Sequence, residues 1–287
     1  MRCAFLAFLL TVLSAPAIAQ SKAEGPNTQV AYLQAHNIYK SGLTGTHTIA
    51  LTFDDGPNFN TLAVLDALKV EKVKATFFIV GKMAAAHPDV LRRIAAEGHL
   101  LANHSADHAL LGKRYVRHPE LLFNELRQVD DEIAPLMPTN ALFFFRAPYG
   151  SWRPAEAALL NADPDLKKYI GPIYWDEGGN VSLDKDGYVL SSADWDCWRR
   201  KWEATICAKG YLREIRRKNG GVVLIHCISG KAAELVQDIV PALEEEGYSF
   251  VRVDQVPTYR QYETPPPTDA EPVIASAGNS RIATASR

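Results

Sequence analysis

The sequence has few cysteines, no excess of charge of either sign and no hydrophobic run long enough to span a membrane. None of its four cysteines is spaced as a Cys-x-x-Cys or Cys₂His₂ pair, which excludes a structural zinc finger. The 31 Lys and Arg residues against 33 Asp and Glu leave a formal charge of −2, which disfavours nucleic acid as a partner. The sequence also lacks Gly-x-Ser-x-Gly, which argues against a nucleophilic serine hydrolase.

The first 19 residues have the pattern of a secretory signal peptide. Arg2 precedes a mostly apolar stretch at residues 4–13, and Ala17-Ile18-Ala19 supplies a cleavage site. The apolar stretch is shorter than the ~18 residues that a spanning helix needs, so we favour cleavage over anchoring. The expected mature protein is secreted or periplasmic and has no transmembrane segment.

Cysteine usage agrees with export. Cys3 leaves with the signal peptide, and Cys197 and Cys207 are close enough in sequence to form a disulfide in an oxidising compartment. Cys227 lies inside an apolar run and is expected to be a buried free thiol.

From about residue 47, short apolar runs alternate with longer helical patterns. Strands are expected at residues 48–53, 75–80, 99–103, 142–145, 170–175, 222–225 and 249–253. Helices are expected at residues 61–70, 88–97, 119–136, 154–161, 211–218 and 231–246. This alternation predicts an α/β protein with a parallel sheet and helices outside it, either a barrel or a doubly wound sheet.

The chain divides into a leader, a folded part and a tail. We expect an N-terminal extension at residues 20–46, the folded domain at 47–256 and a flexible tail rich in Pro, Ala, Ser and Thr at 257–287. Residues 182–209 are acidic and rich in tryptophan without a clear period, which indicates a lid or an insertion.

Chemically reactive side chains follow five of the expected strands where those strands end. The clusters begin at Asp54, His104, Arg146, Asp176 and His226. In (β/α) barrels the carboxyl ends of the strands form one face, so these clusters would converge there. The pattern favours a barrel enzyme.

His104 and His108 lie four residues apart, a spacing that places two imidazoles on one side of a helical turn. Asp54-Asp55 could add the carboxylate that completes a two-histidine, one-carboxylate metal site. The second aspartate could then take a proton from the water at that site. Taken alone, Asp-Asp-Gly-Pro is more often a plain acidic turn and two histidines are weak evidence of a metal site, so the interpretation depends on both motifs together.

Two further residues are candidates for the same site. Arg146 follows a very apolar strand and is expected to pair with a carboxylate such as Asp54, holding it ionised and oriented. His226 ends another apolar strand, where an imidazole is a candidate proton donor. The alternatives are a structural salt bridge for Arg146 and a core histidine for His226.

Together these motifs resemble those of the polysaccharide deacetylases, the NodB-homology domain of carbohydrate esterase family four. The resemblance rests on four segments, residues 52–57, 104–108, 146–149 and 224–226, whose order and spacing match over roughly residues 47–256. It implies a distorted (β/α) barrel with about seven parallel strands in a single domain.

The resemblance also implies a divalent metal ion, usually zinc, with specific roles for the motif residues. The metal ligands would be Asp55, His104 and His108. Asp54 would be the general base and His226 the general acid.

Other residues would bind or orient the substrate. Arg146 would position Asp54, and the backbone N–H of Tyr149, next to Pro148, would stabilise the oxyanion. Either Asp176 or Asp194 would adjust the pKa of His226. Both remain candidates because the family's acidic and Asp-Trp motif, which is usually compact, is divided in this sequence. Trp195 is a candidate for the acetyl pocket.

The implied function is an exported, zinc-dependent deacetylase. It would hydrolyse N-acetyl groups of a GlcNAc-containing polysaccharide or oligosaccharide, chitin-like, peptidoglycan or exopolysaccharide. Two alternatives are an O-acetyl esterase, acting for example on acetylated xylan, and a non-catalytic glycan-binding protein that keeps the metal.

Overall fold

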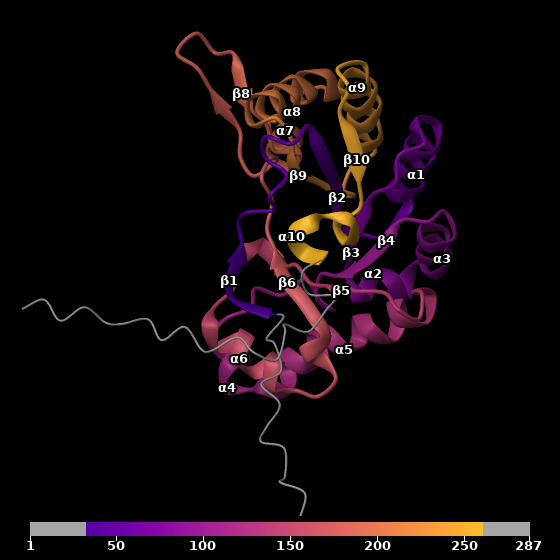
Figure 1. Ribbon diagram of the computed structural model, residues 1–287, viewed down its shortest axis with the longest axis vertical. Coiled ribbons are helices and arrows are strands. Elements are labelled where there is room, and N and C mark those ends of the chain that lie inside the picture. The colour runs from indigo at the N-terminus through magenta and orange to yellow at the C-terminus, as the bar shows by residue number, and fades with distance from the viewer. Residues whose placement is uncertain (1–32, 261–287) are drawn as a thin grey trace, which may run out of the picture.

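The computed structural model describes residues 33–260, and the predicted signal peptide and most of the predicted tail lie outside this range. Strands and helices alternate along it (Figure 1). The strands are β1 (Leu33–Ile38), β2 (Thr48–Gly56), β3 (Thr76–Ile79), β4 (Leu100–Asn103), β5 (Phe143–Phe144), β6 (Tyr169–Ile173), β7 (Ser182–Leu183), β8 (Val189–Ser191), β9 (Gly221–His226) and β10 (Ser249–Val251). The α-helices are α1 (Phe59–Glu71), α2 (Gly81–Ala86), α3 (Pro88–Ala96), α4 (Lys113–Arg117), α5 (Pro119–Ile133), α6 (Pro154–Ala162), α7 (Asp194–Arg199), α8 (Ala204–Lys218), α9 (Lys231–Glu245) and α10 (Pro257–Arg260).

Every strand and helix expected from the sequence overlaps an observed one. The largest difference in bounds is in the helix expected at 211–218, which begins at Ala204. The elements β1, α2, α4, α7, α10 and the β7–β8 hairpin were not expected. The helices among them have six residues or fewer and are too short to show a period.

The parallel strands form a ring made of two sheets. One sheet contains β9, β2, β3, β4 and β10, and the other contains β1, β6 and β5. Two isolated parallel bridges, Asn103 to Phe145 and Glu177 to Val223, join the sheets. The fold is therefore α/β with parallel strands, as predicted, but its two sheets meet through single bridges instead of forming one continuous barrel of about seven strands.

Alternate side chains of the strands fill the inside of this ring. One buried cluster contains inward-facing residues of six strands: Ala50, Phe78, Leu100, Ala102, Phe144, Ile170, Ile173 and Val222. Residues two apart face the same side of a strand, so each inward row can be followed to the carboxyl end of its strand. Four rows lead there to ionisable side chains, namely Asp54, His104, Arg146 and His226.

The outward-facing side chains pack against the helices. Leu51 and Phe53 of β2 and Val223 of β9 belong to a second buried cluster, together with residues of α1, α8 and α9. Figure 1 shows α1 and α3 along one flank of the ring and α8 and α9 along another. The strands are thus buried on both sides, which accounts for their continuous apolar runs.

The folded part extends beyond the expected boundaries at both ends. The expected N-terminal extension contains β1, which pairs with β6 in parallel. The first residues of the expected tail form α10, where Tyr259 is fully buried in the inner cluster. The Val253 N–H donates to Thr76 Oγ1 at the start of β3 over 3.0 Å, so this segment covers the amino-terminal end of the ring.

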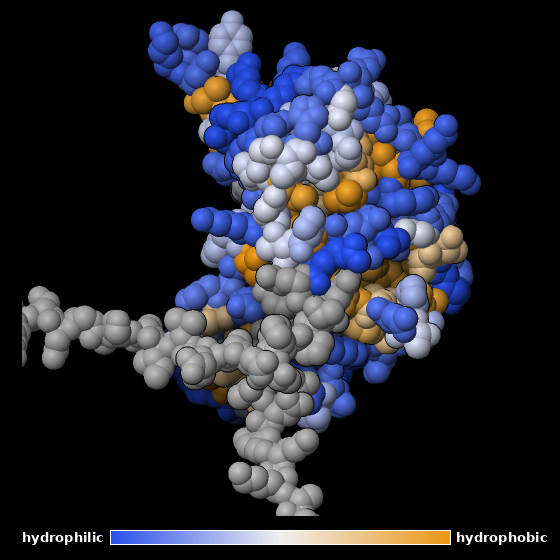
Figure 2. All heavy atoms as spheres, in the orientation of Figure 1, coloured by the Kyte–Doolittle hydropathy of each residue, from blue (hydrophilic) through white to orange (hydrophobic). Residues whose placement is uncertain are grey.

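The expected lid at residues 182–209 divides into two parts. β7 and β8 form an antiparallel hairpin that projects from the body (Figure 1), and its tip is mainly hydrophilic (Figure 2). Beyond the hairpin, Asp194 and Cys197 of α7 are fully buried, so this part of the expected lid or insertion packs into the body. A disulfide from Cys197 to Cys207 ties α7 to α8, and Cys227 is a buried free thiol.

We predict that reducing this disulfide destabilises the protein by about 2–4 kcal/mol, because the bond restricts the unfolded chain. Urea unfolding with and without reductant measures the difference. The variant Cys197→Ser/Cys207→Ser serves as the control, since its midpoint should not respond to reductant. Equal stability of the oxidised and reduced wild-type protein would contradict the prediction.

Candidate metal centre and active site

A cavity of about 470 Å³ opens at the carboxyl ends of the strands. Its walls carry most of the residues singled out in the sequence, together with several apolar ones: Asp54, Asp55, His104, His108, Ala147, Tyr149, Trp175, Gly179, Trp195, Leu224, His226 and Ile228. Four of the five clusters at the strand ends therefore converge on this cavity, as expected. The Asp176 side chain, in the fifth cluster, lies elsewhere.

Asp55, His104 and His108 form a compact trio in this cavity. One ligand atom from each lies within 4.8 Å of the others, and within residues 33–260 no other group of His, Cys, Asp and Glu side chains meets this criterion. Asp55 Oδ1 lies 3.1 Å from His108 Nε2 and 3.6 Å from His104 Nε2. Two imidazoles and one carboxylate at such spacing suit a divalent ion with open positions for water and substrate.

The two histidines meet through a loop, not through the helical turn that their spacing suggested. Residues 104–108 contain no helix, and Ser105 and His108 have positive φ angles of 65° and 56°. Asn103 fixes the loop, because its Oδ1 accepts the Ser105 N–H over 2.9 Å and its Nδ2 donates to Leu126 O over 2.9 Å. Asp55 also has a positive φ, 69°, so the ligands depend on sparsely populated backbone conformations.

Two further observations indicate that these residues fit a metal ion. His104 Nδ1 lies 2.8 Å from the Arg146 carbonyl oxygen, so the ring proton sits on Nδ1 and the Nε2 lone pair faces the trio. Asp55 Oδ1 is buried without a hydrogen-bond partner. An unpartnered buried carboxylate oxygen is costly unless a cation binds it.

Asp54 is held separately from the trio by a buried arginine. Arg146 Nη1 donates to Asp54 Oδ1 over 2.7 Å and to Thr52 Oγ1 over 2.9 Å, and Arg146 is 1% exposed. Burial raises the pKa of Asp54, but the neighbouring charges, above all that of Arg146, outweigh it and leave the pKa below its usual value. Asp54 is therefore ionised at neutral pH.

His226 lies on the other side of the cavity and is paired with Asp194. The His226 Nδ1 and Asp194 Oδ1 atoms are 2.8 Å apart, and the His226 backbone N–H donates to Asp194 Oδ2 over 2.8 Å. Burial lowers the pKa of His226, but the attraction of Asp194 and the charges of Asp54 and Asp55 raise it to about 9. The imidazole is thus protonated at neutral pH.

Asp176, the alternative partner for the acid, has a structural role. Its Oδ2 accepts the Ser41 hydroxyl over 2.7 Å and the Val222 N–H over 2.8 Å, at the opposite end of β9 from His226. Asp194 is therefore the carboxylate that acts on His226.

Some of the expected substrate-binding residues line the cavity and others do not. Tyr149 and Trp195 line the cavity and are 67% and 44% exposed, respectively, whereas Pro148 is buried outside its lining. Tyr149 has a positive φ of 58°, and within residues 33–260 its backbone N–H has no acceptor.

Sequence reasoning missed several apolar residues of the cavity, including Leu224 and Ile228. Leu224 lies two residues before His226 on β9, so the strand period could have placed it in the cavity, whereas Ile228 lies in the turn after β9. Trp175, the last residue of the strand expected at 170–175, is also part of the lining.

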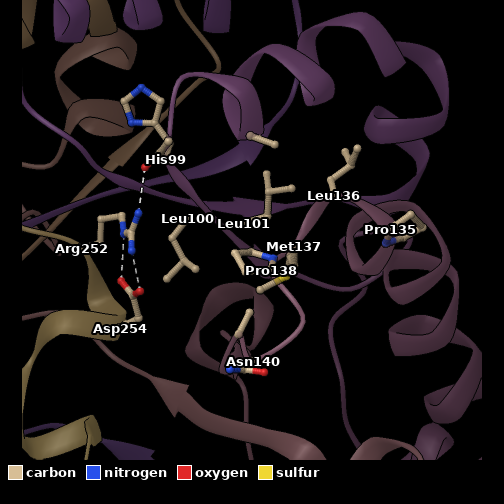
Figure 3. A pocket seen from close by; sticks show the side chains of 13 residues that line it. His99, Leu100, Leu101, Pro135, Leu136, Met137, Pro138, Asn140, Arg252 and Asp254 are labelled. Carbon is tan, nitrogen blue, oxygen red and sulfur yellow. Dashed lines mark hydrogen bonds and ion pairs between the residues drawn. The ribbon is translucent and has the colours of Figure 1, made fainter.

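A separate cavity of about 520 Å³ lies beside the amino-terminal end of β4 (Figure 3). Leu100 and Met137 contribute apolar surface there. Arg252 donates to Gly98 O over 2.9 Å and pairs with Asp254 at 2.7 Å, so its charge is already compensated. This cavity has no catalytic cluster, and the active-site candidate is the one at the carboxyl ends.

The fold and the trio define an α/β protein with a possible metal site at the strand ends. Residues 41–163 match the model of the polysaccharide deacetylase family, so the chain carries a polysaccharide deacetylase domain, as its motifs predict.

Curated relatives and solved structures agree with this family. The peptidoglycan-N-acetylmuramic acid deacetylase PdaC of Bacillus subtilis (strain 168) is 30% identical over 209 residues, which is 72% of this chain and 38% of that protein. The chitooligosaccharide deacetylase of Bradyrhizobium sp. (strain ANU 289) is 40% identical over 111 residues, which is 38% of this chain and 49% of that protein. The chain thus spans less than half the length of either relative.

A solved structure of the T48 deacetylase with substrate has a TM-score of 0.57 and 26% identity, and the match covers 75% of this chain and 92% of that one. This likeness supports the α/β fold with a parallel sheet. Within residues 33–260, no helix has the length and apolar character needed to span a membrane.

We predict that His108→Ala abolishes stoichiometric binding of zinc, because it removes one of three ligands. Isothermal titration of the metal-depleted protein with zinc measures the affinity. His118→Ala is the matched control, since His118 is exposed and lies near Glu120 only. Zinc affinity that is unchanged in His108→Ala would show that the trio is not the metal site.

We also predict that Asp194→Asn lowers the pKa of His226 from about 9, because burial then acts with less opposition. A proton on His226 is present below its pKa and is lost as the pH rises through it, so the variant should lose this proton at a lower pH than the wild type. Titration of the imidazole by NMR in metal-depleted protein measures both values. Asp196→Asn, two residues further along α7 and paired with Arg199 and Arg200, should leave the pKa unchanged.

Proposed function

We propose that this protein is an exported, zinc-dependent deacetylase that hydrolyses N-acetyl groups of a GlcNAc-containing glycan and releases acetate and a free amine. The observation that carries the proposal is one cavity that contains three metal-ligand side chains, an ionised aspartate and a protonated histidine. These groups are the parts that metal-assisted hydrolysis of an amide requires.

Asp55, His104 and His108 would hold the ion, which supplies a Lewis acid that polarises the acetyl carbonyl and acidifies a water molecule. Asp54, which Arg146 holds ionised, would accept a proton from the water that attacks the carbonyl carbon. Asp54 Oδ2 lies 3.5 Å from His104 Nε2, so this oxygen faces the ligands, while Arg146 holds Oδ1. The two adjacent aspartates thus have separate tasks.

His226 completes the reaction from the opposite side. Its Nδ1 is engaged by Asp194, so Nε2 presents a proton to the leaving nitrogen when the C–N bond breaks. The Tyr149 N–H, which has no acceptor among the described residues, can donate to the oxyanion of the tetrahedral intermediate.

The apolar rim of the cavity supports an uncharged sugar substrate. Trp195 and Tyr149 expose aromatic surface on which a sugar ring can stack, and Trp175 lines the same cavity. The names of the relatives, which act on peptidoglycan and chitooligosaccharide, support an N-acetylated glycan. Export is supported by the buried disulfide, which is typical of oxidising compartments, and by the leader pattern.

Acetate release from a panel of N-acetylated and O-acetylated glycans tests the proposal. We expect release from N-acetylated chito-oligomers or peptidoglycan with zinc, and none after chelation. Asp54→Asn should keep zinc but lose roughly 10²–10⁴-fold in rate, the usual contribution of general base catalysis. Asp66→Asn, a surface aspartate paired with Arg93, should keep full activity.

Two outcomes would contradict the proposal. Release from O-acetylated glycans alone would make the protein an esterase. No release from folded, zinc-loaded protein on any of these glycans would favour a binding role.

A further inference from the structure

The pair formed by His226 and Asp194 depends on helix α7, which is too short to be stable by itself. Helix α7 has six residues, and its first residue is Asp194. No side chain caps its N-terminus. The position of the Asp194 carboxylate must therefore be set by contacts from outside α7.

Tyr211 of α8 provides such a contact through its hydroxyl group. The Asp194 N–H donates to Tyr211 Oη over 3.1 Å, and the Tyr211 hydroxyl donates to Leu224 O over 2.9 Å. Tyr211 is fully buried, and burial raises its pKa well above 10, so the hydroxyl always has a proton to donate. One hydroxyl thus connects the backbone of Asp194 to the strand that carries His226.

The backbone at Gly178 packs closely against this hydroxyl contact. A Cβ atom at Gly178 would lie 2.3 Å from Leu224 O and 3.1 Å from Tyr211 Oη, so the chain passes directly over the contact. The disulfide adds a second link, because Cys207 lies one turn before Tyr211 on α8 and binds Cys197 of α7.

We infer that Tyr211 is a positioning residue for the general acid: its hydroxyl fixes Asp194 against His226 by bonding to Asp194 N–H and Leu224 C=O. This inference rests on the proposed function. Tyr211 does not line the cavity, so it would act through Asp194 and not on the substrate.

The test is Tyr211→Phe, which removes only the hydroxyl. We expect kcat for acetate release to fall roughly tenfold, the scale of one lost hydrogen bond, with KM unchanged within about twofold. In the Asp194→Asn background the same substitution should have no further effect, because the pair is already broken. Tyr248→Phe, which changes a tyrosine stacked on His47, is the control and should match the wild type.

Two measurements do not require activity. The His226 Nδ1–H proton should give a low-field NMR resonance in the wild type that is lost in Asp194→Asn and broadened in Tyr211→Phe. In the wild type the Asp194 amide should also exchange slowly with solvent, which tests the contact even if the variant does not fold. The inference is overturned by a Tyr211→Phe variant with wild-type kcat and resonance, by equal losses in both backgrounds, or by fast exchange of the Asp194 amide.

Discussion

The buried ion pair between Arg146 and Asp54 is the interaction on which the rest of the site depends. Arg146 reaches Asp54, Thr52 and the Ile173 carbonyl oxygen, and its guanidinium lies 4.0 Å from the centroid of the Phe78 ring. Its own carbonyl oxygen orients His104. Removing either charge would leave the other unpaired in the interior, at a cost of about 3–5 kcal/mol. One residue therefore links the ionisation of Asp54, the proposed base, to the orientation of His104, a proposed metal ligand.

The ring explains why these charges lie in one place. Inward-facing rows that are apolar near the amino-terminal ends of the strands reach polar side chains at the carboxyl ends. Asp54 and His226 are register partners on adjacent strands, so the base and the acid start from neighbouring backbone positions. Their different environments then separate their pKa values, because Arg146 holds Asp54 ionised and Asp194 keeps His226 protonated.

Much of this arrangement could be predicted from the sequence, because strand ends and apolar runs are local signals. The strands around Asp54, His104, Arg146 and His226 follow from period and burial alone. The loop at 104–108 could not be predicted, since its positive φ angles at Ser105 and His108 depend on tertiary contacts such as those of Asn103. Asp194 was placed in an expected lid or insertion because its segment has no clear period, yet Asp194 is buried and contacts Tyr211, and the disulfide ties its helix to α8.

The most direct test is a crystal structure of the zinc-loaded protein, with the ion located by anomalous scattering. The account predicts one ion bound by Asp55, His104 Nε2 and His108 Nε2, with Asp54 still paired with Arg146 and outside the coordination sphere. An ion bound by Asp54 or by His226 would contradict the separate tasks assigned to the two aspartates and to the acid. So would the absence of an ion from the trio in protein shown to contain zinc.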